Sequence, residues 1–201
     1  MSAKTAVSDR RVVRTRQTLR DALIGLILEK GYDAITVHDI VQRANIARST
    51  FYAHHGSKES VLLDGVGALR DFLAQAQRDQ RSAAAPLAFI RAFFEHADGH
   101  RDLYRALMGD GGGAVVNRAL RQMFVRLIRP VLVEAAGARK RPIALPVEAV
   151  TGFATEGLMA VVTWWLEAKP RLPPAEGERI YLQLIEPALA KNGFAPPPAG
   201  V

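Results

Sequence analysis

The sequence predicts an all-α protein with about nine helices. Apolar residues recur three and four positions apart, as in Leu19, Leu23 and Leu26, which places them on one face of a helix. Residues that begin and end helices separate these periodic segments. No stretch alternates apolar and polar residues convincingly enough to predict a strand, and no internal repeat is present.

Local signals place the ends of the first helices. The helix through Leu19–Ile27 is expected to end at Gly31, because a cation followed by a glycine is a common carboxyl-terminal stop. Thr36 and Asp39 have the spacing of a capping box, in which the threonine hydroxyl accepts a backbone N–H. A second helix is therefore predicted to begin after Thr36.

The remaining helices follow in order. A turn that begins at Asn45 leads to a short helix over residues 48–54, and Ser57 caps a fourth helix. The fourth and later helices are predicted at residues 57–81, 87–96, 101–108, 115–136, 147–168 and 175–191. Pro130 lacks a backbone donor and clashes with the preceding turn, so a kink or break is expected near Arg129.

Composition narrows the class of protein. The 201 residues are 49% hydrophobic and 23% charged, which is typical of a globular protein with a sizeable core. Cysteine is absent, which excludes thiolate metal sites and cysteine nucleophiles and fits a reducing compartment. The amino terminus has no signal-peptide pattern, and the apolar run Gly157–Leu166 is shorter than the roughly 18–20 residues of a membrane span. We therefore expect a cytoplasmic protein without a membrane segment.

Positive charge is concentrated at the amino-terminal end. Residues 1–58 contain ten Lys and Arg against five Asp and Glu, so they carry +5 of the formal net charge of +7. This excess indicates an anionic partner, either nucleic acid or a membrane surface, whereas a merely solvated arginine-rich helix would have the same charge. Charge alone leaves these alternatives open.

Residues 36–58 combine a short capped helix, a three-residue turn and a second short helix rich in polar and basic residues. This is the layout of a helix-turn-helix, whose second helix enters the major groove of double-stranded DNA. Arg48 suits a bidentate contact to guanine, and Ser49 and Thr50 are short donors suited to close approach. The other donors suit phosphate oxygens, which position the duplex without reading it: Tyr52, His54 and Lys58.

The segment 35–63 resembles the amino-terminal domain of the tetracycline-repressor (TetR/AcrR) family of bacterial transcriptional regulators. The resemblance rests on the turn around Asn45-Ile46, the aromatic pair Phe51-Tyr52 and the run Gly56-Ser57-Lys58-Glu59, and it extends over about residues 14–64. It implies that Thr36 contacts a phosphate and that His38 lies where some members reach a base. It also implies that residues 48–50 begin the recognition helix.

Two positions depart from the family pattern. A small residue, often glycine, is usual where Ser49 stands, and an aromatic residue is usual where His55 stands. His55 is expected either to pack against the first helix or to add a contact to phosphate.

The resemblance also implies an organisation for the whole chain. It predicts a DNA-binding domain over residues 1–57, a helical ligand-binding and dimerisation domain over 58–192, and a flexible tail over 193–201. Homodimers would form through the helices at 147–168 and 175–191, and such a dimer reads a palindromic operator. A small molecule in the second domain would then change the separation of the two recognition helices and release the DNA.

Large apolar residues at helical spacing are candidates for the lining of a pocket for a hydrophobic effector. The candidates are Phe93, Tyr104, Met108, Met123, Phe124, Phe153 and Trp164. Such residues are more often plain core, so a pocket lined by some of them is better supported than any single assignment.

Other chemistry has little support in the sequence. His96 and His100 have the spacing of two ligands on one helix face, but no third ligand is fixed by spacing, so no metal site is predicted. No paired acid and base or activated nucleophile is evident, and no enzymatic activity or cofactor is expected. The sequence thus predicts a ligand-responsive regulator, most simply a repressor. The alternative is an all-α small-molecule-binding protein or enzyme without a role on DNA.

Overall fold

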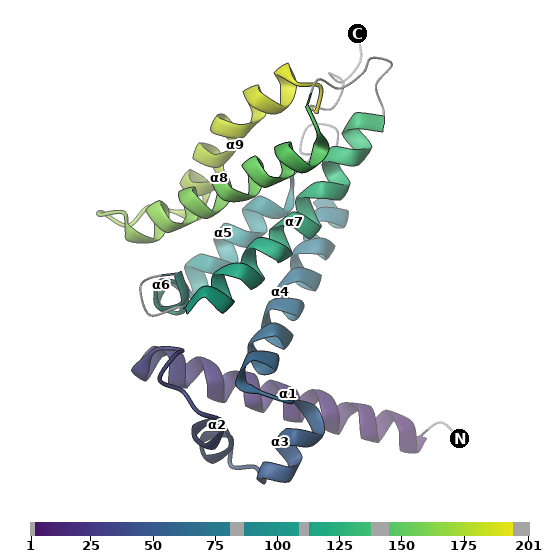
Figure 1. Ribbon diagram of the computed structural model, residues 1–201, viewed down its shortest axis with the longest axis vertical. Coiled ribbons are helices and arrows are strands. Elements are labelled where there is room, and N and C mark those ends of the chain that lie inside the picture. The colour runs from purple at the N-terminus through teal and green to yellow at the C-terminus, as the bar shows by residue number, and fades with distance from the viewer. Residues whose placement is uncertain (1–2, 81–86, 109–112, 138–144, 195–201) are drawn as a thin grey trace. The chain divides into compact units, whose positions relative to one another are not determined.

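The structure, a computed structural model, describes residues 3–80, 87–108, 113–137 and 145–194, and within α1 the side chains from Arg11 onward. All regular structure in these ranges is helical, which confirms the predicted class (Figure 1). The helices are α1 (Ala3–Lys30), α2 (Val37–Ala44), α3 (Arg48–His54), α4 (Lys58–Gln80), α5 (Phe89–Gly99), α6 (Arg101–Met108), α7 (Gly113–Gly137), α8 (Val147–Glu167) and α9 (Pro174–Lys191).

The chain forms two compact units. The first comprises residues 1–68 and 106–119, and the second comprises residues 69–105 and 120–201. The sequence-based boundary between residues 57 and 58 coincides with the start of α4, whereas the compact units divide within that helix. Each unit has its own apolar interior and is described by itself.

The first unit is built around α1, against which α2 packs. Its core contains the fully buried side chains of Leu19, Ile40, Phe51 and Val61, which come from four different helices. Burial of these side chains fixes the short helices α2 and α3, because isolated helices of seven or eight residues are not stable in water.

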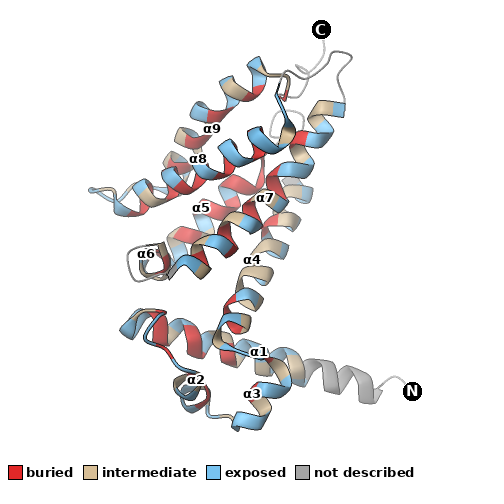
Figure 2. Cartoon of the chain, viewed as in Figure 1, coloured by how far each residue is buried: buried red, intermediate tan, exposed pale blue. Residues whose placement is uncertain are grey.

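The second unit holds an aromatic interior. In this unit α9 packs against both α5 and α8, and Figure 2 shows buried residues along α5 and α8. The Phe93 and Phe124 rings meet edge to face with centroids 4.8 Å apart, and the Tyr181 hydroxyl donates a 3.0 Å hydrogen bond to the Ala154 carbonyl oxygen. These contacts join α5 to α7 and α9 to α8.

Helix α7 differs from its prediction. It continues from Gly113 to Gly137 with Pro130 inside it, so the predicted break near Arg129 is wrong. Pro130 lies on the exposed side of the helix, where water can satisfy the carbonyl that loses its partner, while Ile128 and Leu132 are buried on either side of it. Burial on both sides holds the two halves of the helix together.

Helix α8 is long and apolar enough, by length and composition, to pass for a membrane span, although 56% of its most apolar window is buried within the protein. Its inward residues include Leu158, Val162 and Trp165, none of which is exposed. The burial and the apolar composition of α8 therefore agree with a helix that contributes one side to the core of a folded unit.

The carboxyl-terminal end of α9 corrects the predicted tail. Gly193 has a φ of 89°, and the Phe194 N–H donates a 2.8 Å hydrogen bond to the Leu189 carbonyl oxygen, which is the pattern of a Schellman motif. Phe194 is only 1% exposed. Residues 193 and 194 therefore close the last helix rather than begin a flexible tail, and residues 195–201 lie outside the described part of the chain.

Candidate nucleic-acid interface

Two local motifs fix the geometry of α2 and α3. The Thr36 hydroxyl accepts a hydrogen bond from the Asp39 N–H at 3.2 Å, and the Asp39 carboxylate accepts from the Thr36 N–H at 2.7 Å. This confirms the predicted capping box. Asn45 has a φ of 50° in the left-handed region and ends α2, and the turn over residues 45–47 leads into α3. The predicted helix-turn-helix is thus present.

The acidic member of the capping box is also held by a cation. The Lys30 ammonium lies 2.9 Å from the Asp39 carboxylate. Its hydrogen bond, together with those from Thr36, keeps the pKa of the Asp39 carboxyl well below its usual range. Sequence reasoning did not identify Lys30, which links the end of α1 to the start of α2.

The exposed side of α3 carries the predicted base-reading residues. Arg48 and Ser49 are exposed and Thr50 is half-buried. The Arg48 guanidinium lies 5.6 Å from the centre of the Tyr52 ring, and one of its nitrogens donates a 3.4 Å hydrogen bond to the Tyr52 hydroxyl. In the structure the guanidinium thus lies beside the Tyr52 side chain.

Adjacent aromatic residues of α3 have different surroundings. Phe51 is fully buried, whereas Tyr52 is 49% exposed, and their rings meet edge to face at 5.3 Å. The Phe51 ring anchors α3 in the core, whereas Tyr52 is exposed and His54 is half-buried. On α2 and its cap, Thr36 and His38 are also exposed.

His55 occupies an interior position. It is only 6% exposed, and its ring lies 6.1 Å from that of Phe51. Of the two alternatives for His55, packing in the interior is therefore confirmed over a contact to phosphate. Burial lowers the pKa of the His55 imidazole, and the nearby Arg16, His54 and Arg20 lower it further, against the opposite effect of Asp64.

Lys58 is engaged within the protein. Its ammonium donates hydrogen bonds to the backbone carbonyl oxygens of Tyr32, Asp33 and Ile35 at 2.9, 3.2 and 2.8 Å. The residue before it, Ser57, exchanges two 3.2 Å hydrogen bonds with Ser60 and caps α4 as predicted. The ammonium thus points into the protein, whereas the sequence predicted that it contacts a phosphate.

The residues predicted to line a ligand pocket do not share one location. Phe93, Tyr104, Met123 and Phe124 are buried in the second unit, and the Phe93 and Tyr104 rings meet edge to face at 5.7 Å. Burial raises the pKa of the Tyr104 phenol. Met108 is half-buried and belongs to the first unit.

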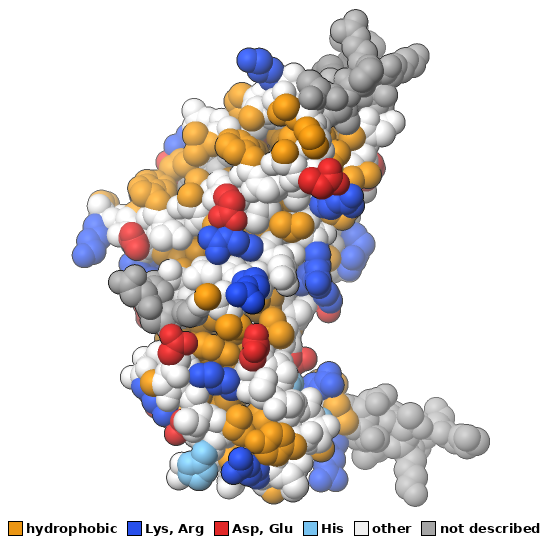
Figure 3. All heavy atoms as spheres, in the orientation of Figure 1, with side chains coloured by type: hydrophobic (Ala, Val, Ile, Leu, Met, Phe, Trp, Pro, Cys, Tyr) orange, Lys and Arg blue, Asp and Glu red, His pale blue; other side chains and the backbone are white. Residues whose placement is uncertain are grey.

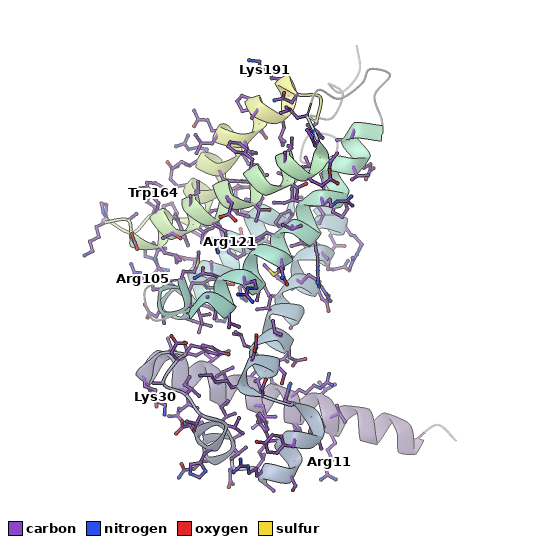
Figure 4. The ribbon with its side chains drawn as sticks, in the orientation of Figure 1. Arg11, Lys30, Arg105, Arg121, Trp164 and Lys191 are labelled. Carbon is purple, nitrogen blue, oxygen red and sulfur yellow. The ribbon has the colours of Figure 1, made fainter. Side chains whose placement is uncertain are left out.

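Phe153 and Trp164 correct that prediction further. They are 62% and 47% exposed, so they do not line an interior pocket. Both lie on the outer side of α8, and Trp164 is near the carboxyl-terminal end of that helix (Figure 4). On the face drawn in Figure 3, hydrophobic side chains gather over α8 and α9. Helix α8 is apolar on both sides, so periodicity does not distinguish its inward face from its outward one.

The helix-turn-helix and its exposed polar face are the features of a DNA-binding domain, and comparison with known proteins agrees. Residues 19–64 match the family model described as "Bacterial regulatory proteins, tetR family". Over these residues the chain is similar to the amino-terminal domain of TetR-family regulators.

Curated relatives are similar mainly over this domain. The chain is 49% identical over 55 residues to the uncharacterized HTH-type transcriptional regulator YxbF of Bacillus subtilis, which is 27% of this chain and 14% of that protein. It is 29% identical over 122 residues to the HTH-type transcriptional regulator TcmR of Streptomyces glaucescens, covering 59% of this chain and 50% of that protein. The chain thus spans half or less of the length of these relatives.

Solved structures share the fold over most of the chain. A TetR transcriptional regulator from Streptococcus agalactiae has a TM-score of 0.67 at 23% identity, covering 90% of this chain and 98% of that one. FadR from Bacillus subtilis, solved in complex with stearoyl-CoA, has a TM-score of 0.65 at 17% identity, covering 84% and 96%. The second unit therefore has the fold found in regulators of this family.

Proposed function

We propose that this protein is a transcriptional repressor that binds a palindromic operator as a homodimer and releases it when a small molecule binds. The observation that carries the proposal is the capped helix-turn-helix with Arg48 oriented on the exposed side of α3. A guanidinium there suits the guanine edge in the major groove. The curated relatives are transcriptional regulators, and one of them, IcaR of Staphylococcus aureus, is described as negative.

We assign the residues of the proposed DNA interface to base contacts or to phosphate contacts from the position and exposure of their side chains. Arg48, Ser49, Thr50 and His38 are the candidates for base edges, because they lie on α3 and α2 at or near the surface. The candidates for phosphate contacts are Thr36, Tyr52 and His54. Base contacts set the preferred sequence, whereas phosphate contacts set the position of the duplex.

The proposed dimer uses the outer side of α8 and α9. Phe153 and Trp164 on α8 and Leu184 on α9 are large, apolar and 62%, 47% and 65% exposed. Such residues on two neighbouring helices suit burial against a second copy across a two-fold axis. Other apolar residues of the same two helices, such as Leu158 and Ile185, are buried within the chain and do not belong to this surface.

The proposed effector is hydrophobic, and the aromatic interior around Phe93 and Phe124 supports this choice. Structural neighbours include FadR proteins solved with lauroyl-CoA and stearoyl-CoA. Lauroyl-CoA and stearoyl-CoA are therefore the first probes to add, and a binding effector should raise the Tm and weaken operator affinity. We place this regulator in the cytoplasm, without enzymatic activity.

The experiment that tests the function is selection of duplexes from a random pool by the purified full chain, followed by titration of the enriched duplex. We expect a palindromic sequence and binding at least about a thousandfold tighter than to random duplex. Arg48→Ala should remove most of this preference, since the homodimer loses one bidentate contact in each half-site and each contact supplies roughly 1–3 kcal/mol of discrimination. Arg70→Ala, on the exposed middle of α4, is the matched control and should leave the preference unchanged. Equal affinity for enriched and random duplex would contradict the proposal.

A further inference from the structure

The Lys58 ammonium lies in a cradle of backbone oxygens. It bonds the carbonyls of Tyr32, Asp33 and Ile35, and it lies 4.5 Å from the centre of the Tyr32 ring. Tyr32 and Ile35 are 3% and 2% exposed, so the floor of the cradle is part of the core. A primary ammonium has three N–H donors, and the three carbonyl oxygens can accept all of them.

The electrostatics of this cradle favour a cation. Its carbonyls follow directly after α1, which ends at Lys30, and the carboxyl-terminal end of a helix has a partial negative charge. The face of the Tyr32 ring adds a further attraction for an ammonium. Moving the Lys58 ammonium to a phosphate would break these contacts and leave the carbonyls without the cation.

The cradle joins two parts of the proposed DNA interface. Lys58 is the first residue of α4, whereas Ile35, one of its acceptors, immediately precedes Thr36, the cap of α2. The connection between α1 and α2 is further shaped by the hydrogen bond from the Ile35 N–H to the Tyr32 carbonyl oxygen. One side chain thus connects the start of α4 to the start of α2, across 23 residues of sequence.

We propose that Lys58 is a positioning residue that ties α4 to the connection between α1 and α2 and thereby sets the placement of α2 and α3 for operator binding. It does so through its three carbonyl contacts and makes no contact with phosphate. This inference rests on the proposed DNA-binding function. It assigns to Lys58 a different task from that of the surface donors Tyr52 and His54.

Two substitutions at this position separate the alternatives. Lys58→Met keeps the length of the side chain and removes the charge and donors. Lys58→Arg keeps the charge, but the N–H donors of the guanidinium lie in one plane. They cannot point at three carbonyl oxygens that surround a single ammonium. Lys30→Met is the matched control, because it removes the same charge from the same unit and breaks one half-exposed ion pair with Asp39.

Each variant is measured in three ways as the full chain. Thermal unfolding gives the Tm, and titration with the enriched duplex and with random duplex gives the ratio of the two affinities. Repeating the titrations over a range of salt concentrations gives the slope of log K against log salt, which changes by about 0.9 for each phosphate that the protein no longer neutralises.

We expect Lys58→Met and Lys58→Arg to lower the Tm by about 4 °C or more, and Lys30→Met to lower it much less. At temperatures where the variants are folded, both Lys58 variants should lose roughly tenfold in the affinity ratio, comparable to one mismatched base pair, with the salt slope unchanged. A slope reduced by about one in Lys58→Met with the Tm unchanged, and full rescue by arginine, would show a phosphate contact and overturn the inference.

Two further outcomes are informative. A lower Tm with an unchanged affinity ratio would leave Lys58 with a purely structural role and also overturn the inference. If the unsubstituted protein has no preference among duplexes, the proposed function is wrong. The claim that Lys58 places α2 and α3 for operator binding is then wrong as well. The Tm of the Lys58 variants relative to Lys30→Met then still measures whether the carbonyl contacts hold the unit together.

Discussion

The His55 imidazole lies against the Phe51 ring in the core of the DNA-binding unit, and its Nε2 atom is buried without a hydrogen-bond partner. A buried polar atom in this state destabilises the folded protein. The groups around it that affect its charge are Arg16 and Arg20 on α1, His54 on α3 and Asp64 on α4. Burial dominates, so the folded protein favours the neutral ring.

This arrangement predicts that acid destabilises the protein. Because the pKa of His55 is lower in the folded than in the unfolded state, the unfolded chain binds more protons once the pH falls below about 6.5. The free energy of unfolding should be constant with respect to His55 above that pH and should decrease as the pH falls through the window between 6.5 and the lowered pKa. His96 has a pKa lowered by burial and contributes in the same direction.

His55→Phe tests this assignment. Phenylalanine removes the unpartnered nitrogen and the titration, so the variant should be more stable by about 1–3 kcal/mol and should lose part of the decrease at low pH. Urea unfolding at pH 5.5 and 7.5 gives both quantities, and His38→Phe, at an exposed position of α2, is the control. An unchanged pH dependence in His55→Phe would show that His55 does not titrate in this window.

Helices α5 and α9 of the second unit pack closely where they meet at Gly177. A Cβ atom at this buried glycine of α9 would clash with the Phe94 ring of α5, which is itself fully buried. Gly177→Ala should therefore force the two helices apart and lower the free energy of unfolding by about 1–3 kcal/mol. Gly67→Ala in α4, where nothing lies within 4 Å, should raise it by about 0.5–1 kcal/mol through helix propensity. Equal effects of the two substitutions in urea unfolding would contradict the crossing.

The stability of the second unit is expected to depend strongly on the buried guanidinium of Arg101. Arg101 on α6 stacks 4.2 Å from the centre of the Trp165 ring and donates to the Trp165 and Leu166 carbonyl oxygens at the end of α8. Its third partner is the Asp98 carboxylate at 3.2 Å. Arg101→Met should lower the free energy of unfolding by about 2–4 kcal/mol, because it removes the stacking on Trp165 and leaves the buried Trp165 carbonyl oxygen without its side-chain donor.

The neighbouring Arg105 is the control for that prediction. It also donates to the Leu166 carbonyl oxygen, at 2.9 Å, but its side chain is 44% exposed, so water can replace it. Arg105→Met should therefore cost less than about 1 kcal/mol in the same denaturation experiment. If both substitutions have the same effect, burial of the Arg101 guanidinium does not decide its contribution.

Features that depend on residues close together in the sequence could be predicted, whereas contacts between distant residues could not. The Thr36–Asp39 capping box and the left-handed Asn45 depend on residues within a few positions of one another, so spacing is enough to predict them. The carbonyl partners of Lys58 lie 23 to 26 residues earlier in the chain, and no spacing rule reveals them. The buried Arg101 was missed for the same reason, since its acceptors are 64 and 65 residues away.

The faces of α8 show a second limit. Periodicity identifies residues that share a side of a helix, but α8 is apolar on both sides, so the sequence placed Trp164 in the pocket lining without showing which side of α8 faces inward. In the structure Trp165 is fully buried and donates to the Pro173 carbonyl oxygen, whereas Trp164 is exposed. An apolar outer side on a helix already buried on its inner side indicates a second contact surface.

The proposed dimer predicts where charge will disrupt assembly. Phe153 on α8 and Leu184 on α9 are 62% and 65% exposed, so glutamate at either position leaves the interior of the chain unchanged. Burial of a carboxylate against a second copy is unfavourable without a cation to pair with it. Phe153→Glu combined with Leu184→Glu should therefore shift the protein from dimer to monomer in sedimentation equilibrium, with the helix content unchanged.

Operator binding provides a second readout of the same change. A monomer engages only one half-site, so the double variant should lose most of its affinity for the enriched palindrome while binding to an isolated half-site is unaffected. Val133→Glu, an equally drastic change at an exposed apolar position of α7, is the control and should leave both assembly and affinity as they are. A double variant that remains dimeric would move the interface away from this side of α8 and α9, and a Val133→Glu variant that dissociates would move it to α7.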